Sequence, residues 1–323
     1  MKKRFAITLI ISVVFLLVAN YCVYWHRYLN EPVSDHDIHF VMQKNGSIAS
    51  LAIALKQDAH LSHPVYFELY ARAMGDVKRL RYGEYEFPAG SNLKQILYRV
   101  THGKIAYHAF TLVDGWNIYD VMMALDRSPA LSHKLTGLSP TMVAEAMRIP
   151  YRTPEGMLYP ETYYYTLGTS DLTLLTRAYT KMQSHLATLW SKRQPGLAYN
   201  NTYQALIVAS MVEKEASKSN ELPKVAGVIL NRLKVHMPLQ IDSTVIYGLQ
   251  PGFDGHLTRP DLRFNTPFNS YVHYGLPPTP ISMPGLDAIS AVLHPAKTKA
   301  MYFVAKGDGY HQFSTSLAIS EKR

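Results

Sequence analysis

Apolar residues form one unbroken run near the N-terminus and recur at regular spacing through the rest of the chain. Residues 5–25 contain no charged side chain and follow Lys2, Lys3 and Arg4. A run of ~20 apolar residues is long enough to cross the hydrocarbon core of a bilayer as a helix. Cationic residues before such a span keep the N-terminus in the cytoplasm. The pattern predicts a single-pass anchor in the cytoplasmic (inner) membrane, with the bulk of the chain periplasmic.

A cleaved signal peptide is the competing interpretation of the same run. The run is long for a signal sequence, and no small-x-small cleavage site follows it. Asn20 and Tyr21 stand where a lipoprotein signal before Cys22 has small residues. Tyr24 and Trp25 at the end of the run suit a membrane interface. We therefore expect an uncleaved anchor at 5–25, a cytoplasmic tip at 1–4 and a polar linker at 26–36.

Residues 37–105 alternate between strand and helix spacing, which is typical of a small α+β module. The predicted elements are a strand at 38–41, a helix that Gly46 and Ser47 open, a helix at 64–73, a strand at 82–87 and a helix through Leu93, Ile96 and Leu97.

Residues 106–323 continue the mixed pattern and predict a larger α+β catalytic domain. Strands are predicted at 109–113 and 301–305, and helices at 118–125, 172–190 and 203–216. A further helix is expected after Ser219 and Asn220, which would cap it, with Pro223 in its first turn. Asn231 and Arg232 would lie at the border of its apolar face.

Composition and charge exclude several classes of function. The 323 residues are 47% hydrophobic, which is enough for a globular core. The net charge of +9 includes Lys2, Lys3 and Arg4, and a modest excess suits an anionic polymer or a membrane surface. No basic run with interleaved aromatic residues indicates nucleic-acid binding. One cysteine and 14 scattered histidines without paired spacing predict no disulfide framework, no metal and no cofactor.

Two glutamates lie at the end of the predicted helix at 203–216. Val208, Met211 and Glu215 share one face, so Glu215 extends an apolar stripe. A carboxyl that loses hydration has a raised pKa, as a general acid near neutral pH requires. Glu213 lies on a smaller, more polar face. It is either a supporting partner of the site or a solvated residue, and we expect the latter.

The motifs around these glutamates resemble the endolytic murein transglycosylase family. The resemblance covers the chain from the anchor to the C-terminus, and its most specific part is 212–215 with 225–228 and 231–233. Further matching motifs lie at 156–163, 239–248, 265–266, 269–271, 275–278, 281, 284–285, 294–296, 302–305 and 311–313. Ile241 and Phe268 depart from the family pattern, where Thr and Tyr are usual, and neither change removes a candidate acid.

The resemblance implies a fold, a reaction and partners. It implies a LysM-like module at 37–105 and a lyase that cleaves the β-1,4 bond between N-acetylmuramic acid and N-acetylglucosamine within glycan strands, leaving 1,6-anhydro ends and limiting nascent strand length. Glu215 corresponds to the family's catalytic glutamate, which acts first as general acid and then as general base. Peptidoglycan strands are the implied substrate, and penicillin-binding peptidoglycan synthases are the implied partners.

Other polar residues in or beside the motifs are candidates for contacts to the sugar. They are Asn231, Arg232, Gln240, Asp242, Tyr247, Asn269, Tyr271 and Glu161. Uncharged amides and hydroxyls suit acetamido and hydroxyl groups, but each can equally hold a loop in place. Arg232 would meet a carboxylate in the substrate or in the protein, and a plain helix cap is the alternative role of residues 242–244.

Two alternatives remain open at this point. Glu155 or Glu161 as a second carboxylate would make the chain a muramidase that hydrolyses the same bond. A non-catalytic peptidoglycan-binding scaffold is the second alternative, and Glu215 at the end of an apolar stripe argues against it. Reducing ends in the products would indicate the hydrolase, and anhydro ends the transglycosylase.

Overall fold

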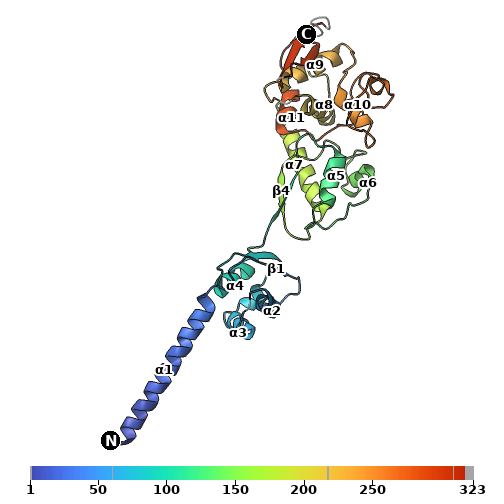
Figure 1. Ribbon diagram of the computed structural model, residues 1–323. Helices are drawn as coiled ribbons and strands as arrows, with labels where there is room; N and C mark the ends of the chain where they lie inside the picture. The colour runs from blue at the N-terminus through green and yellow to red at the C-terminus, as the bar shows by residue number, and fades with distance from the viewer. Residues whose placement is uncertain (1, 60, 217, 308, 317–323) are drawn as a thin grey trace. The chain divides into compact units, whose positions relative to one another are not determined.

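The protein consists of two compact units, Met1–His108 and Ala109–Arg323, each with its own hydrophobic core (Figure 1). The computed structural model describes residues 2–59, 61–216, 218–307 and 309–316. It combines helices with three two-stranded sheets, which is the mixed α+β class that the spacing of apolar residues predicts.

The first unit begins with a long apolar helix, α1 (Lys2–Asn30). Within its segment Phe5–Asn30, an 18-residue stretch has a mean hydropathy of 2.5, and the helix is long and apolar enough to cross a membrane. The helix continues beyond the predicted span and replaces the first part of the expected linker. Leu29 is buried in the core of the first unit, with Trp25 and Tyr28 packed beside it. This packing explains why the helix continues to Asn30.

A two-stranded sheet and three α-helices form the rest of the first unit. β1 (Ile38–Met42) pairs antiparallel with β2 (Gly83–Phe87), so that Ile38 lies opposite Phe87. Between the strands lie α2 (Ile48–Ala59), α3 (Pro64–Ala73) and a 3₁₀ turn, η1 (Asp76–Arg79), and α4 (Leu93–Thr101) follows β2. The predicted module elements are present within a few residues of these bounds, while the LysM-like assignment stays a prediction.

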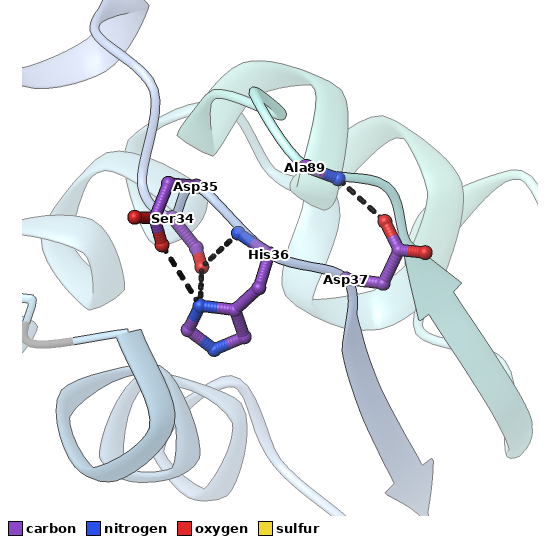
Figure 2. A network of polar contacts seen from close by, with 5 residues as sticks. All are labelled: Ser34, Asp35, His36, Asp37 and Ala89. Atoms are coloured by element: carbon purple, nitrogen blue, oxygen red, sulfur yellow. Dashed lines mark hydrogen bonds and ion pairs between the residues drawn. The ribbon is translucent and has the colours of Figure 1, made fainter.

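The segment after α1 is held by polar contacts to the turn before α4. Asp37 accepts a hydrogen bond from the backbone N–H of Ala89 at 2.8 Å, and His36 Nδ1 lies 2.9 Å from Ser34 Oγ (Figure 2). Asn92 then caps α4 reciprocally with Gln95. The bonds of Asn92 and Gln95 satisfy backbone groups that the start of α4 would otherwise leave free.

The second unit is mainly helical. Its elements are β3 (His108–Thr111), α5 (Ile118–Asp126), α6 (Pro140–Ala146), β4 (Thr162–Tyr165), α7 (Asp171–Ser191), α8 (Thr202–Glu215), α9 (Leu222–Lys234), α10 (Asp242–Gly248), η2 (Asp261–Arg263), α11 (Leu286–Leu293), β5 (Tyr302–Ala305) and β6 (His311–Ser314). β3 pairs with β4, and β5 pairs antiparallel with β6. At the centre, α8 packs against α7, α9 and α11.

The burial of α8 corrects the one-face stripe inferred from its sequence. Residues 205–212 are all buried, including Leu206, Ala209 and Ser210 on the face expected to be more polar. α11, which the sequence analysis missed, is one of the helices that cover it. The position of an acid on this helix is therefore decided by the elements around the helix end, and not by one apolar face.

The start of α9 also differs from its prediction. Pro223 lies in the first turn as expected, but the residue before the helix is Glu221, and Ser219 and Asn220 do not cap it. Arg232 is buried instead of lying at the border of the apolar face.

Candidate active site

Glu215 lies at the C-terminal end of α8, partly buried, with its carboxyl directed toward the start of α10. Ser243 Oγ donates a hydrogen bond to Glu215 Oε1 at 2.8 Å. Burial raises the pKa of Glu215, and the Ser243 hydroxyl opposes this by favouring the charged form. The end of a helix carries partial negative charge, which also disfavours a carboxylate there. The site thus holds an acid that keeps its proton more readily than a solvated glutamate.

Two further residues act electrostatically on Glu215, one on α10 and one on β6. Asp242 at the start of α10 raises the pKa of Glu215, and His311 on β6 lowers it. His311 is held in place by Glu221, because its backbone N–H donates to Glu221 Oε2 at 3.0 Å and its Nδ1 lies 2.8 Å from the same atom. Glu221 is buried. The hairpin of β5 and β6 therefore brings an imidazole toward the acid.

Tyr271 joins the same cluster. Its hydroxyl donates to Asp242 Oδ1 at 2.6 Å, and its own pKa is raised by burial, by this bond to Asp242 and by the nearby negative charges of Asp242 and Glu215. The ring also borders a hollow of about 560 Å³ whose other lining residues are Arg259, Leu262, Arg263 and Val272. Glu215, Ser243, Asp242 and Tyr271 thus meet beside a surface that two arginines flank.

α10 also contacts a second carboxyl. The Tyr247 hydroxyl donates to Glu155 Oε2 at 2.9 Å, and the backbone N–H of Ile118 donates to the same atom at 2.9 Å. Glu155 is fully buried, and burial raises its pKa to about 8. A carboxyl without exposed surface cannot contact a glycan strand. The alternative that Glu155 serves as a second catalytic carboxylate is therefore wrong. Tyr247, which donates to this buried carboxyl, supports the fold of the site.

Glu213 is half-buried and bonded, which corrects the expectation that it is solvated. The backbone N–H of Gly285 donates to its Oε2 at 3.0 Å. Burial raises the pKa of Glu213, the Gly285 bond lowers it, and the negative charge of Asp114 raises it further. Glu213 therefore holds the start of α11, while Glu215 points to α10.

Three of the candidate sugar-binding residues instead hold backbone segments together. Asn231 Nδ2 donates to the carbonyls of Thr298 and Ala300 at 2.9 and 3.0 Å. Arg232 donates from Nε to the Met301 carbonyl at 2.6 Å and from Nη1 to the Leu239 carbonyl at 2.5 Å. Asn269, fully buried, donates to the Phe264 carbonyl at 2.8 Å and to two neighbouring carbonyls.

The expectation that Arg232 meets a protein carboxylate is wrong for the described part of the chain. Its hydrogen bonds to Met301, Pro238 and Leu239 go to backbone carbonyls, and its guanidinium lies 5.1 Å from the centre of the Tyr302 ring. Such contacts shape the walls around Glu215 without touching the acid. They hold the residue before β5 and the segment that leads into α10 against α9.

Gln240 and Glu161 have different surroundings. Gln240 is exposed, has a positive φ of 50° and donates its backbone N–H to the Ser270 carbonyl at 3.1 Å. Glu161 is exposed and forms an ion pair with Lys181 of α7. Gln240 thus precedes the site directly in the chain, whereas the contact that the structure gives Glu161 is a surface salt bridge.

Sequence reasoning missed the roles of Ser243 and His311. Residues 242–244 were a possible helix cap, but the residue before α10 is Ile241 and no side chain caps it. A hydroxyl one turn before Tyr247 on a short helix was the available signal for Ser243. Across residues 2–59, 61–216, 218–307 and 309–316, no group of three or more His, Cys, Asp or Glu side chains is arranged to hold a metal ion.

Comparison with known proteins places similar sequences in one family. The profile of the YceG-like family matches residues 40–322. An endolytic murein transglycosylase of Bacillus subtilis is 28% identical over 315 residues, which cover 91% of this chain and 86% of that protein. Endolytic murein transglycosylases of two Streptococcus pneumoniae strains are 33% identical over 156 residues, covering 47% of this chain and 28% of theirs.

A solved structure of the same family also resembles this chain. The crystal structure of a putative yceG-like protein from Listeria monocytogenes superposes with a TM-score of 0.56 at 27% identity, covering 90% of this chain and 99% of that one. Because the family profile extends over most of the sequence and both units, the chain belongs to the YceG-like family.

Proposed function

We propose that this chain cleaves peptidoglycan glycan strands as an endolytic lytic transglycosylase, with Glu215 as the single catalytic acid and base. The activity is the one for which its Bacillus subtilis and Streptococcus pneumoniae relatives are named. One observation carries the assignment to Glu215. The residue is partly exposed, burial raises its pKa, and its carboxyl receives an orienting hydrogen bond from Ser243.

In this reaction Glu215 gives up one proton and later takes one back. Protonated Glu215 donates to the glycosidic oxygen as the bond from that oxygen to C1 of the muramyl sugar breaks, and the N-acetylglucosamine end leaves as an alcohol. The carboxylate then accepts the proton of the muramyl 6-hydroxyl as O6 bonds to C1. A 1,6-anhydro ring forms, no water is consumed, and Glu215 ends protonated as it began. General acid–base catalysis of this kind contributes roughly 10²–10⁴-fold.

The surroundings of the other carboxyls favour this scheme over hydrolysis. A two-carboxylate hydrolase needs a second ionised group with access to the sugar. Glu155 is buried and Glu161 is paired with Lys181. Asp242, which is exposed, accepts the Tyr271 hydroxyl and acts electrostatically on Glu215, is the carboxylate that we would assign to a hydrolase mechanism. A non-catalytic scaffold would have no use for a partly exposed glutamate whose pKa is raised, whereas a general acid requires one.

The first unit completes the proposal. α1 anchors the chain in the cytoplasmic membrane with its N-terminus inside, in keeping with the cationic residues before the span. The module of β1, α2, α3, β2 and α4 binds glycan in the LysM-like manner and raises the concentration of substrate near the site. Association with penicillin-binding synthases rests on the family resemblance.

Mass spectrometry of the products tests the function. The full chain in detergent is incubated with purified glycan strands, and the new ends are analysed. Anhydro ends, lighter by one water than reducing ends, are expected from the wild type and from Asp242→Asn. Reducing ends that disappear in Asp242→Asn would replace the proposal with a two-carboxylate hydrolase.

A further inference from the structure

One face of α3 is apolar and exposed although the helix lies within a folded unit. Val65 is 62% exposed, Leu69 55% and, just after the helix, Met74 57%. Val65, Leu69 and Ala73 follow each other at four-residue spacing, so they lie on one side of the helix. Contiguous exposed apolar surface of this kind marks an interaction site more often than it occurs by chance.

The other side of α3 already makes the contacts with the core. Phe67 and Ala71 are fully buried against the first unit. Glu68 and Arg72, which form an ion pair with each other, lie at the border between the two sides. The exposed face is thus an additional apolar surface, with its charged residues kept to one edge, as in helices that lie at a membrane surface.

The apolar face is continuous with the end of α1. Trp25 of α1 lies 6.0 Å from Tyr66 of α3 between ring centres, and the Tyr28 hydroxyl donates to the His63 carbonyl at 2.5 Å. Between the helices lies a hollow of about 590 Å³. Its walls include Tyr21, Tyr24 and Trp25 of α1, and Tyr66, Leu69 and Tyr70 of α3.

The length of α1 gives the depth of this surface in a bilayer. At 1.5 Å per residue, Trp25 lies about 30 Å along the axis from Phe5. That distance equals the hydrocarbon thickness of roughly 30 Å, so Trp25 reaches the boundary between acyl chains and headgroups. Tyrosine and tryptophan favour this boundary. Since α3 packs against Trp25 and Tyr28, α3 lies at the level of the headgroups.

We propose that the exposed face of α3 inserts into the headgroup–acyl boundary of the same leaflet in which α1 ends. This proposal rests on the proposed anchoring by α1. The occupant of the surface is lipid: acyl chains cover Val65 and Leu69, and one enters the hollow between the aromatic side chains. Lys78, in the exposed turn that follows, faces an environment where anionic headgroups attract cations. The first unit is then fixed to the membrane along a second helix and does not swing on α1.

Depth-dependent quenching tests the proposal on the full chain. Cys22 is the one cysteine in the sequence, so Cys22→Ala gives a background in which single cysteines are labelled with a fluorophore. Leu69→Cys reports on the docking face, Phe15→Cys on the anchor, and Glu86→Cys, an exposed position on β2, serves as the aqueous control. The proteins are reconstituted in phosphatidylethanolamine–phosphatidylglycerol vesicles with or without doxyl-labelled lipid.

We expect quenching at Phe15 and Leu69, with roughly three-fold more quenching at Leu69 than at Glu86. Val65→Asp together with Tyr66→Asp should reduce the quenching at Leu69 to the level of Glu86, with an unchanged far-UV spectrum. Quenching at Phe15 without quenching at Leu69 would overturn the proposed insertion of α3, while the anchoring by α1 would still be supported. Absence of quenching at Phe15 would overturn both. Protection of Leu69 from doxyl lipid and from aqueous iodide alike would show a protein cover, such as a second copy, and would also overturn the proposal.

Discussion

Ser243 and Tyr247 lie one helical turn apart on α10, and each donates its hydroxyl to a different glutamate. Residues four apart share a helix face. Ser243 reaches Glu215, which is partly exposed, and Tyr247 reaches Glu155, which is fully buried. One short helix therefore connects the accessible acid to a carboxyl in the core, and a shift of α10 would disturb both.

Glu215→Gln should abolish cleavage and leave the fold intact. The amide has nearly the same shape but no acidic proton, so activity should fall by roughly 10²–10⁴-fold. Glu213→Gln is the matched control two residues earlier, where the amide oxygen can still accept from Gly285. It should lose less than about ten-fold, since Glu213 holds the start of α11 and does not transfer a proton. A dead Glu213→Gln beside an active Glu215→Gln would contradict the assignment.

Ser243→Ala should change the pH dependence of the reaction. The Ser243 hydroxyl stabilises the charged form of Glu215, so its removal raises the pKa of that carboxyl. The acid then keeps its proton to higher pH, and the alkaline limb of kcat/KM should move to higher pH. Rates are measured from pH 4 to 9 on soluble glycan strands. Ser243→Thr keeps the hydroxyl and should restore the wild-type limb; an unmoved limb in Ser243→Ala would argue against this role.

Glu155→Gln should remove a pH-dependent component of stability. The pKa of Glu155 is about 8 in the folded protein and near 4.5 as the ordinary value. Between these values the folded state holds a proton that the unfolded state releases, so stability falls as pH rises through this window. The slope is up to about 1.4 kcal/mol per pH unit.

Urea unfolding of the second unit at several pH values measures this slope. In Glu155→Gln the amide cannot ionise, and its oxygen can still accept from Ile118 and Tyr247, so the component should vanish. Identical slopes in the wild type and the variant would show that Glu155 is charged in the fold or not linked to folding.

Arg232→Lys should destabilise the second unit by about 2–4 kcal/mol, although it keeps the charge. A lysine cannot reproduce the two directed bonds to the carbonyls of Met301 and Leu239. Lys234→Ala, at an exposed position on the same helix, is the control and should stay within about 0.5 kcal/mol of the wild type. Chemical denaturation measures both, and equal stabilities would mean that Arg232 does not hold these segments.

A chain that begins at Ala109 should retain the chemistry but need more substrate. The second unit has its own core, and we expect the first unit to act by bringing glycan close. A thermal melt of the truncated protein comes first, to show that it folds. KM on soluble strands should then rise while the anhydro product stays unchanged. A folded truncation that makes no product at saturating glycan would assign the first unit to the catalytic site.

Local patterns predict most of the elements, because they depend on spacing within a few residues. The bounds of α3 are as predicted, and β1, α5 and α7 deviate by one or two residues. α11 was missed because its eight residues follow a turn-rich, proline-containing segment and are too few for a clear period. β6 was missed because its alternation is short and its pairing with β5 is not encoded in its own sequence.

The sequence points to one acid of the candidate site but not to its surroundings. Glu215 was proposed from its helix and the family resemblance and stays a prediction, whereas the burial of residues 205–212 around the whole helix was not expected. The contacts of Asn231, Arg232 and Glu213 depend on partners far along the chain, such as Thr298, Met301 and Gly285. Residue type gives hydrogen-bonding capacity but does not say whether a backbone carbonyl or a sugar uses it.

The hairpin of β5 and β6 has a consequence for the timing of activity. It supplies His311 to the surroundings of Glu215 and the Met301 carbonyl to Arg232. Chains are made from the N-terminal side and begin to fold as they emerge, so Glu215 is present before these supporting residues. The complete surroundings of the acid can therefore form only once residue 314 has been made, and a chain shortened before β5 would carry Glu215 without them.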